Sequence, residues 1–267
     1  QGLNYGIDFR GGTNIQIRFK EVPNLDQLRN FFSEQNLGNV MLQTFGAVED
    51  REILLGLSVD NPLGTGEKLT AGLREMLQPN YPEMEIRRIE TIGPKVGDEL
   101  KTSALQAILI ALGLVLIYIT FRFQWRQGIA AIITLLHDVM VVVGIFSIFD
   151  KEFTLPVIAA LLTVVGYSLN DTIVIFDRIR ENISKFRKRE LLPLINQSVT
   201  ETLSRTLLTS GTTLMVVLAL VFLGGEIIHD FAFALLVGVL IGTYSSIYVA
   251  SPTVLWLTKI APPKTSD

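Results

Sequence analysis

Five long apolar stretches dominate the second part of the chain. They cover about 102–121, 129–148, 154–176, 204–223 and 231–257. An α-helix rises about 1.5 Å per residue and the hydrocarbon core of a bilayer is about 30 Å thick, so about 20 apolar residues suffice to cross it. The pattern therefore predicts an integral membrane bundle of five spanning α-helices, which occupies residues 102–260.

The first 101 residues lack an apolar stretch of that length and show shorter, alternating segments instead. Apolar and polar positions alternate as in β-strands at 13–19, 40–46, 52–59 and 84–92. Helical spacing occurs at 25–36 and 66–78, with Asn24 and Thr65 as candidate N-caps. The resulting order, βαββαβ, predicts an α+β head domain of the ferredoxin-like class over residues 1–101.

Charged loops between the stretches predict how the bundle is oriented. Arg122 and Arg126 separate the first two stretches, and six basic residues lie between the third and the fourth, within 178–189. The other two loops are short and acidic. Lys and Arg favour the cytoplasmic side, so we expect an extracytoplasmic head and a cytoplasmic tail, 261–267. An external N-terminus needs a preceding membrane segment, so we also expect a sixth span upstream of Gln1.

The segment 178–203 joins the third and fourth stretches and has an amphipathic pattern. Its apolar residues, from Ile179 to Val199, fall roughly on one helical face with basic residues around them. We expect a cytoplasmic helix that lies on the inner membrane surface. Both a charged connector and a docking site are compatible with this pattern.

The composition narrows the class of protein further. Of the 267 residues, 49% are hydrophobic and 18% are charged, which argues against an ordinary soluble enzyme. The net charge of −3 provides no basic surface for nucleic acid. Cysteine is absent and two histidines occur, which excludes disulfides and thiolate chemistry and leaves little for a metal site. We therefore expect no catalytic residues, no metal, no cofactor and no enzymatic activity.

Polar and ionisable side chains interrupt three of the apolar stretches. They are His137 and Asp138 in the second stretch, Tyr167, Asn170 and Asp171 in the third, and Arg205 at the start of the fourth. An ionisable group at membrane depth costs several kcal/mol, so its presence indicates a function or a buried partner. These six residues form the candidate site.

Helical spacing places these residues on defined faces. Tyr167, Asn170 and Asp171 share one face of the third helix, and threonines follow Arg205 on one face of the fourth. We expect the polar faces to meet inside the bundle, where Asp171 and Arg205 can form an ion pair. One interpretation is a static pair that fixes helix register. The other is a proton relay in which Asp171 alternates between protonated and paired states, and the additional polar residues favour the relay.

Two further pairs of residues have structural or functional interpretations. For His137 and Asp138 a static contact and a part in the relay stay equally open. Gly238 and Gly242 lie four residues apart in the last stretch. Small residues at this spacing predict a face for close helix packing.

Four motifs give the chain a resemblance to a known family. They are GIDFRGGT at 6–13, His137-Asp138, VGYSLNDTIVIFDRIREN at 165–182 and LSRTLLTS at 203–210. In this order they resemble the SecF branch of the SecD/SecF family of protein-export membrane subunits, over nearly the whole chain. The family is similar to resistance-nodulation-division transporters. Its six-span pattern agrees with the number of spans expected from the loop charges.

The resemblance implies a role in protein export across a bacterial or archaeal plasma membrane, the cell inner membrane. Family members pair with SecD in the lipid bilayer and associate with the SecYEG channel and with a small accessory membrane subunit. They use the proton motive force to move unfolded polypeptides during translocation. The residues that correspond to Asp171 and Arg205 are implicated in proton movement.

The resemblance also implies a structural role for the first motif. Gly6, Asp8, Gly11 and Gly12 match the turn at which the head joins the membrane part. Glycine is the residue that tight turns and close backbone approaches require.

Two other functions fit parts of the pattern. A proton-coupled small-molecule exporter of the resistance-nodulation-division type can use the same scaffold, but such exporters usually have a larger extracytoplasmic part and twice the spans. A passive assembly subunit has no need for buried ionisable groups. The resemblance, together with the buried ionisable residues, therefore favours a proton-driven subunit of a protein-export translocase.

Overall fold

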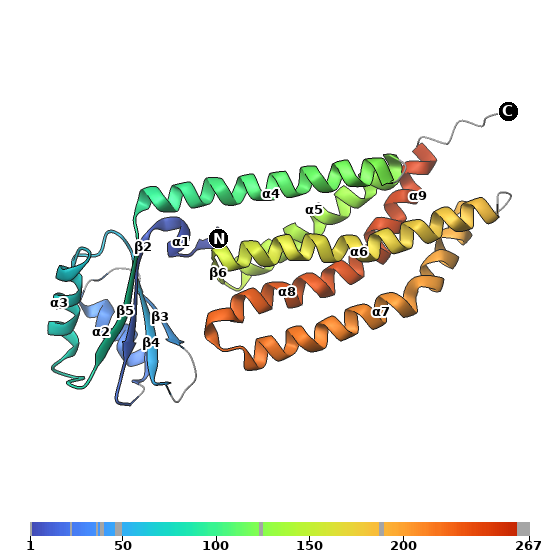
Figure 1. Cartoon of the computed structure of the whole chain (residues 1–267). Coiled ribbons are helices and arrows are strands. Elements are labelled where there is room, and N and C mark those ends of the chain that lie inside the picture. Colours follow the sequence, from blue (N-terminus) through green and yellow to red (C-terminus); the bar gives the residue numbers. More distant parts are fainter. Residues whose placement is uncertain are drawn as a thin grey trace.

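The computed structural model describes residues 2–21, 23–35, 37, 40–45, 50–122, 125–186 and 190–260. The predicted tail, 261–267, lies outside the described residues, as do residues 1, 36, 46 and 187–189. A small head of strands and helices lies at one end of a bundle of long helices, and the last helix lies at the other end (Figure 1). We call these the head end and the far end of the bundle.

Six elements form the head. They are β2 (Gly12–Arg18), α2 (Leu25–Glu34), β3 (Val40–Phe45), β4 (Glu52–Leu57), α3 (Glu67–Leu77) and β5 (Glu85–Ile92). The strands pair in the order β3-β4-β2-β5, and every neighbouring pair is antiparallel. Because side chains alternate across a strand, Ile15, Ile17 and Leu55 are buried in one core with Leu28 of α2 and Leu73 of α3. The elements lie within about two residues of the predicted ranges.

The two candidate N-caps in the head have different outcomes. Asn24 caps α2, because its Oδ1 atom accepts hydrogen bonds from the backbone N–H groups of Asp26 at 2.9 Å and Gln27 at 3.3 Å. The prediction for Thr65 is wrong. Gly66 is the N-cap of α3, without a side-chain hydrogen bond, and its φ of +67° supplies the turn into the helix.

Five helical segments that are long and apolar enough to cross a membrane follow the head, which confirms the predicted spans. Their elements are α4 (Pro94–Arg122), α5 (Trp125–Ile148), α6 (Leu155–Lys185), α7 (Leu191–Leu223) and α8 (Glu226–Ser245), which continues through η2 (Ser246–Ala250) into α9 (Ser251–Ile260). The η2 element is a π-helical turn. The apolar part of α6 is 56% buried and that of α4 is 11% buried, so α6 is the central helix.

The prediction of a separate helix over 178–203 is wrong. Its first part continues α6 as far as Lys185, and its last part belongs to α7, which begins at Leu191. The physical reason is the direction of the apolar face. Ile179 and Ile195 are buried in the same core as the apolar residues of α5, so this face packs inside the bundle and not on a membrane surface.

Short elements that the sequence pattern did not predict connect the head to the bundle. Strand β1 (Asn4–Tyr5) pairs in parallel with β6 (Glu152–Phe153), which lies between α5 and α6. Helix α1 (Ile7–Arg10) follows β1. Asp8 of α1 accepts a hydrogen bond from the backbone N–H of Leu155 at 3.0 Å and so satisfies a free donor at the N-terminus of α6.

The glycine pair lies between α1 and β2, close to the start of α4. Gly11 ends α1 with a φ of +75°, and Gly12 begins β2 with a φ of +153°. A Cβ atom on Gly12 would lie 2.5 Å from the carbonyl oxygen of Leu57, which is closer than any side chain can approach. The backbone here therefore requires glycine.

Small residues let α8 approach α6 closely. A Cβ atom on Gly238 would lie 2.1 Å from a methyl group of Val164, and one on Gly242 would lie 3.2 Å from Cβ of Ser168. The two helices therefore touch through the glycine face of α8.

Candidate functional site

Asp138 of α5 is buried and accepts hydrogen bonds from two other helices. Its Oδ2 atom accepts one from Ser168 Oγ of α6 at 2.5 Å and one from Ser245 Oγ of α8 at 2.8 Å. Its Oδ1 atom lies 2.9 Å from Nδ1 of His137, whose side chain is 34% exposed. The carboxylate of Asp138 therefore joins α5, α6 and α8, and both of its oxygens have a partner.

Asp171 of α6 is buried too, but its environment differs. Within the described part of the chain its side chain accepts one hydrogen bond, from Ser210 Oγ of α7 at 3.4 Å. Ser210 also lies 2.7 Å from the hydroxyl of Thr243 on α8 and accepts a hydrogen bond from Tyr167 at 3.2 Å. Asp171 therefore lies beside hydroxyl groups from three helices.

The expected ion pair between Asp171 and Arg205 is wrong for this structure. Arg205 is exposed, and its guanidinium forms no ion pair with any described residue. The axial positions of the two residues explain this. The Asp171–Ser210 hydrogen bond fixes the level at which α6 and α7 face each other. Because Arg205 precedes Ser210 by five residues, it lies about one turn farther from the head than Asp171.

The polar faces of α6 and α7 do not close fully on each other, contrary to expectation. Asn170 and Thr163 on α6 are exposed, and so is Thr212 on α7. Tyr167 and Asp171 lie against the hydroxyl groups instead. Polar side chains therefore face outward from the chain at the level of its apolar segments.

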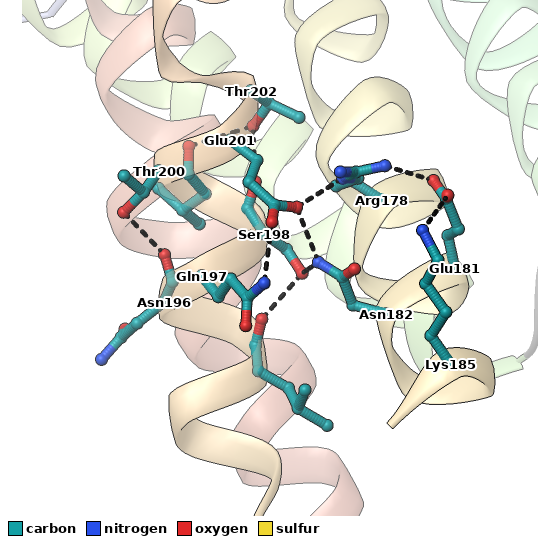
Figure 2. A network of polar contacts seen from close by, with 12 residues as sticks. Arg178, Glu181, Asn182, Lys185, Asn196, Gln197, Ser198, Thr200, Glu201 and Thr202 are labelled. Atoms are coloured by element: carbon teal, nitrogen blue, oxygen red, sulfur yellow. Dashed lines mark hydrogen bonds and ion pairs between the residues drawn. The ribbon is translucent and has the colours of Figure 1, made fainter. Parts of the chain in front are cut away.

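A polar network at the far end of α6 and α7 was not predicted from the sequence. Figure 2 shows Arg178 between two carboxylates, with Nε 2.5 Å from Glu201 Oε2 and Nη1 2.5 Å from Glu181 Oε2. Asn182 donates hydrogen bonds to Glu201 and to Ser198, each at 2.9 Å. The buried Asn182 and Ser198 lie on the apolar face of the 178–203 segment, and a polar residue on such a face was the available signal.

A second cluster of charges lies at the head end, outside the five apolar segments. Glu152 of β6 is half-buried, and this burial is the main reason why the pKa of its carboxyl rises to about 7. The negative charges of Asp230 and Asp8 also raise this pKa, whereas Arg10 lowers it. Lys151 forms an ion pair with Asp230 at 2.8 Å. Glu152 could not be identified from the sequence pattern, because strand β6 is two residues long and has no period.

Over the described ranges, no group of three or more His, Asp or Glu side chains is arranged so that it could hold a metal ion. The buried carboxyl and hydroxyl groups of Asp138, Asp171 and Ser210 can bind protons or form hydrogen bonds.

Most of the chain matches a known protein family. A family model described as "Protein export membrane protein SecD/SecF, C-terminal" covers residues 73–260. The chain belongs to the SecD/SecF family. A second model, described as the SecD/SecF GG motif, matches residues 1–21, which include Gly11 and Gly12.

Curated relatives in the SecD/SecF family are named protein translocase subunit SecF. The chain is 50% identical over 256 residues to the relative from Desulfurispirillum indicum, with 94% of this chain and 81% of the relative covered. It is 48% identical to the relative from Vibrio alginolyticus, with 96% of this chain and 80% of that relative covered. It is 41% identical to the relative from Pseudomonas aeruginosa, with 100% of this chain and 87% of that relative covered.

Solved structures of SecDF have the same fold. The structure described as SecDF, a translocon-associated membrane protein, from Thermus thermophilus matches with a TM-score of 0.83 and 41% identity over 96% of this chain. A structure described as SecDF in the super-membrane-facing form matches with a TM-score of 0.71 and 42% identity over 97% of this chain. The chain spans about a third of these longer chains, 34% and 35% respectively.

Proposed function

We propose that the chain is a proton-driven subunit of a protein translocase and that protons cross the membrane at Asp171 to drive late steps of export. Asp171 carries this proposal, because it is a carboxyl group buried in a spanning helix beside hydroxyl groups, without an ion pair to any described residue. Such a group can bind and release a proton. The curated relatives are named as translocase subunits, which favours an unfolded polypeptide over a small molecule as the transported substrate.

The physical mechanism uses the charge of Asp171. When Asp171 is ionised, its charge attracts the guanidinium of Arg205, about one turn away on α7. When Asp171 is protonated, this attraction disappears. A proton that crosses about 150 mV releases about 3.5 kcal/mol, enough to shift a two-state equilibrium about 300-fold. Two arrangements of α6 and α7, one with Asp171 and Arg205 paired and one without this pair, can thereby alternate as protons flow.

Tyr167 and Ser210 extend the site toward the head end. Tyr167 lies one turn closer to the head than Asp171, and both side chains reach the hydroxyl of Ser210. We assign this hydroxyl group to the path by which a proton reaches Asp171. His137 and Asp138 belong to the neighbouring cluster on α5, where Asp138 holds three helices together.

The partner on the membrane side is SecD in this proposal. Asn170, Thr163, Arg205 and Thr212 are exposed on the surface of the apolar helices, and polar groups are costly in lipid. A second membrane protein that covers this face removes the cost. The SecDF chains, three times as long as the matched part, have room for such helices. The SecYEG channel, a small accessory subunit and the translocating polypeptide complete the proposed assembly.

The head and the tail are assigned to opposite sides of the membrane. We propose a ferredoxin-like, extracytoplasmic head over residues 1–101, a membrane domain over 102–260 and a cytoplasmic tail over 261–267. The antiparallel order β3-β4-β2-β5, with α2 and α3 packed on one face, supports the proposed head fold. The basic residues at the far end of α6 support the orientation.

Gradient-driven export from membrane vesicles tests the proposal. The vesicles carry Asp171→Asn, and assembly with the partner chains is measured in parallel. Export that depends on the proton gradient is expected to fall at least tenfold with assembly intact, because asparagine cannot bind a proton. Asp60→Asn, an equal charge change at an exposed position of the head, serves as the control. Normal export by Asp171→Asn would contradict the proposal.

A further inference from the structure

Arg205 lines an open cavity at the far end of α6 and α7. The cavity has a volume of about 360 Å³. Its charged lining residues are Asp177, Arg178, Glu181, Glu201 and Arg205. The guanidinium of Arg205 therefore shares this space with carboxylates, although it forms no ion pair with any described residue.

The register of α6 and α7 places Arg205 between two sets of acidic groups. The hydrogen bonds Asp171–Ser210 and Asn182–Ser198 show that the two helices run antiparallel, so residues later in α6 face residues earlier in α7. By this register Arg205 lies level with the residues just before Asp177. Asp171 is about one turn toward the head, and Glu201 is one turn toward the far end on the same helix.

Two of the carboxylates that line the cavity together with Arg205 belong to Asp177 and Glu201, and we call them the cavity carboxylates. Asp177 pairs with Arg122 of α4 at 2.8 Å and is 40% exposed. Glu201 is held in place by Arg178 and Asn182, as Figure 2 shows. Both carboxylates are therefore held by other residues in the lining of the cavity that Arg205 also lines.

A guanidinium cannot lose its proton in a protein, so Arg205 stays charged in both states of Asp171. Beside apolar segments a positive charge needs a counter-ion at every stage of a proton cycle. Ionised Asp171 supplies one, but protonated Asp171 does not. The cavity carboxylates line the same cavity as Arg205, on the side away from Asp171.

We propose that Asp177 and Glu201 form a second counter-ion site for Arg205, which the guanidinium occupies while Asp171 is protonated. This inference rests on the proposed function and adds positioning residues to it. Among the described residues, the charged groups around Arg205 are Asp177, Arg178 and Glu181 on α6 and Glu201 on α7, with Asp171 about one turn away and Arg122 on α4 paired to Asp177. In this proposal the arginine moves between two acidic sites during the proton cycle.

Infrared titration of the purified complex, with its partner chains in lipid nanodiscs, tests the inference. The carbonyl band of protonated Asp171 is identified as the band that Asp171→Asn removes. In Glu201→Gln and in Asp177→Asn the second site is weakened, so Arg205 pairs more with ionised Asp171. The band is then expected to titrate about one pH unit lower than in the parent complex. Glu190→Gln, the same change at the start of α7 and outside the cavity, is expected to leave the titration unchanged.

Glu201→Gln and Asp177→Asn are both measured, so that a local folding defect in one variant cannot by itself account for the shift. Glu201→Gln alters the contacts of Asn182 and Arg178, whereas Asp177→Asn leaves those contacts intact. Glu201→Asp keeps the charge and is expected to restore the parent titration. A titration that stays in place in both neutral variants, or a shift that Glu201→Asp fails to reverse, would overturn the inference.

The result is separable from that of the export assay. If Asp171→Asn exports normally, the proposed function fails, while the infrared shift still decides whether Arg205 has a second counter-ion site. If Asp171→Asn blocks export and neither cavity variant moves the titration, the second site alone is wrong.

Discussion

Asp138 and Asp171 are equally buried aspartates on neighbouring helices, yet their surroundings differ. Asp138 has three polar neighbours between 2.5 and 2.9 Å, from α5, α6 and α8. Asp171 has one hydroxyl neighbour at 3.4 Å among the described residues. Hydrogen bonds to a carboxylate stabilise its charged form, and Asp138 has more of them than Asp171. Two aspartates of similar burial therefore have different hydrogen-bonding environments, and our proposal for Asp171 rests on that difference.

Removing each carboxylate separates the two sites most strongly. Asp138→Ala is expected to lower the free energy of unfolding by about 3 kcal/mol, because three donors lose their shared acceptor. Asp171→Asn is expected to leave it unchanged or to raise it, because an uncompensated buried charge is removed. Thermal unfolding of the two variants in detergent compares them directly. Equal losses would abolish the distinction between the sites.

The hydroxyl donors provide a finer comparison. Ser245→Ala removes a donor at 2.8 Å from Asp138 and is expected to cost about 1.5 kcal/mol, as for other hydrogen bonds to charged groups. Ser210→Ala removes the long contact to Asp171 and is expected to cost less than about 1 kcal/mol, with a larger effect on gradient-driven export. Thermal midpoints and export rates, measured on both variants, check this opposite ranking.

Glu152 provides a titratable reference outside the apolar segments. Its folded-state pKa of about 7 lies above the ordinary value of 4.5, so the folded chain binds this proton more tightly than the unfolded chain does. The free energy of unfolding should therefore decrease as the pH rises through this range. Glu152→Gln is expected to be about 1 kcal/mol more stable than the parent near pH 8, with the partial exposure of Glu152 taken into account, and no more stable near pH 4. A stability difference that is independent of pH would assign the effect to packing.

The sequence predicted the parts of the fold that depend on periodicity. Runs of apolar residues located the five long helices, and alternation located the four strands of the head sheet. The two-residue strands β1 and β6 are too short to show a period, so the connection between head and bundle was missed. The 178–203 segment was misplaced because an amphipathic face can lie against a membrane or against other helices, and a helical wheel does not distinguish the two.

The candidate site was predicted by residue type but not by pairing. Spacing along one helix placed Asn170 and Asp171 on one face, although Asn170 is exposed and Asp171 is buried in the structure. Spacing does not show the level at which two helices meet, and Arg205, for which an ion pair with Asp171 was possible, lies about one turn farther from the head. The hydroxyl donors to Asp138, Ser168 and Ser245, are 30 and 107 positions away in the sequence, so no local sequence pattern predicts these contacts.

The π-helical turn η2 divides the last span into two differently directed parts. A π turn contains one residue more than an α turn, so the side chains after it are rotated by about 100° relative to an uninterrupted helix. Before the turn, Gly238 and Gly242 face α6. After it, Val254 and Leu257 enter the core that contains Ala131 and Leu135 of α5. A single extra residue thus sets which side chains of the last span pack against α5 after the turn, while Ser245, just before it, already contacts Asp138 of the same helix.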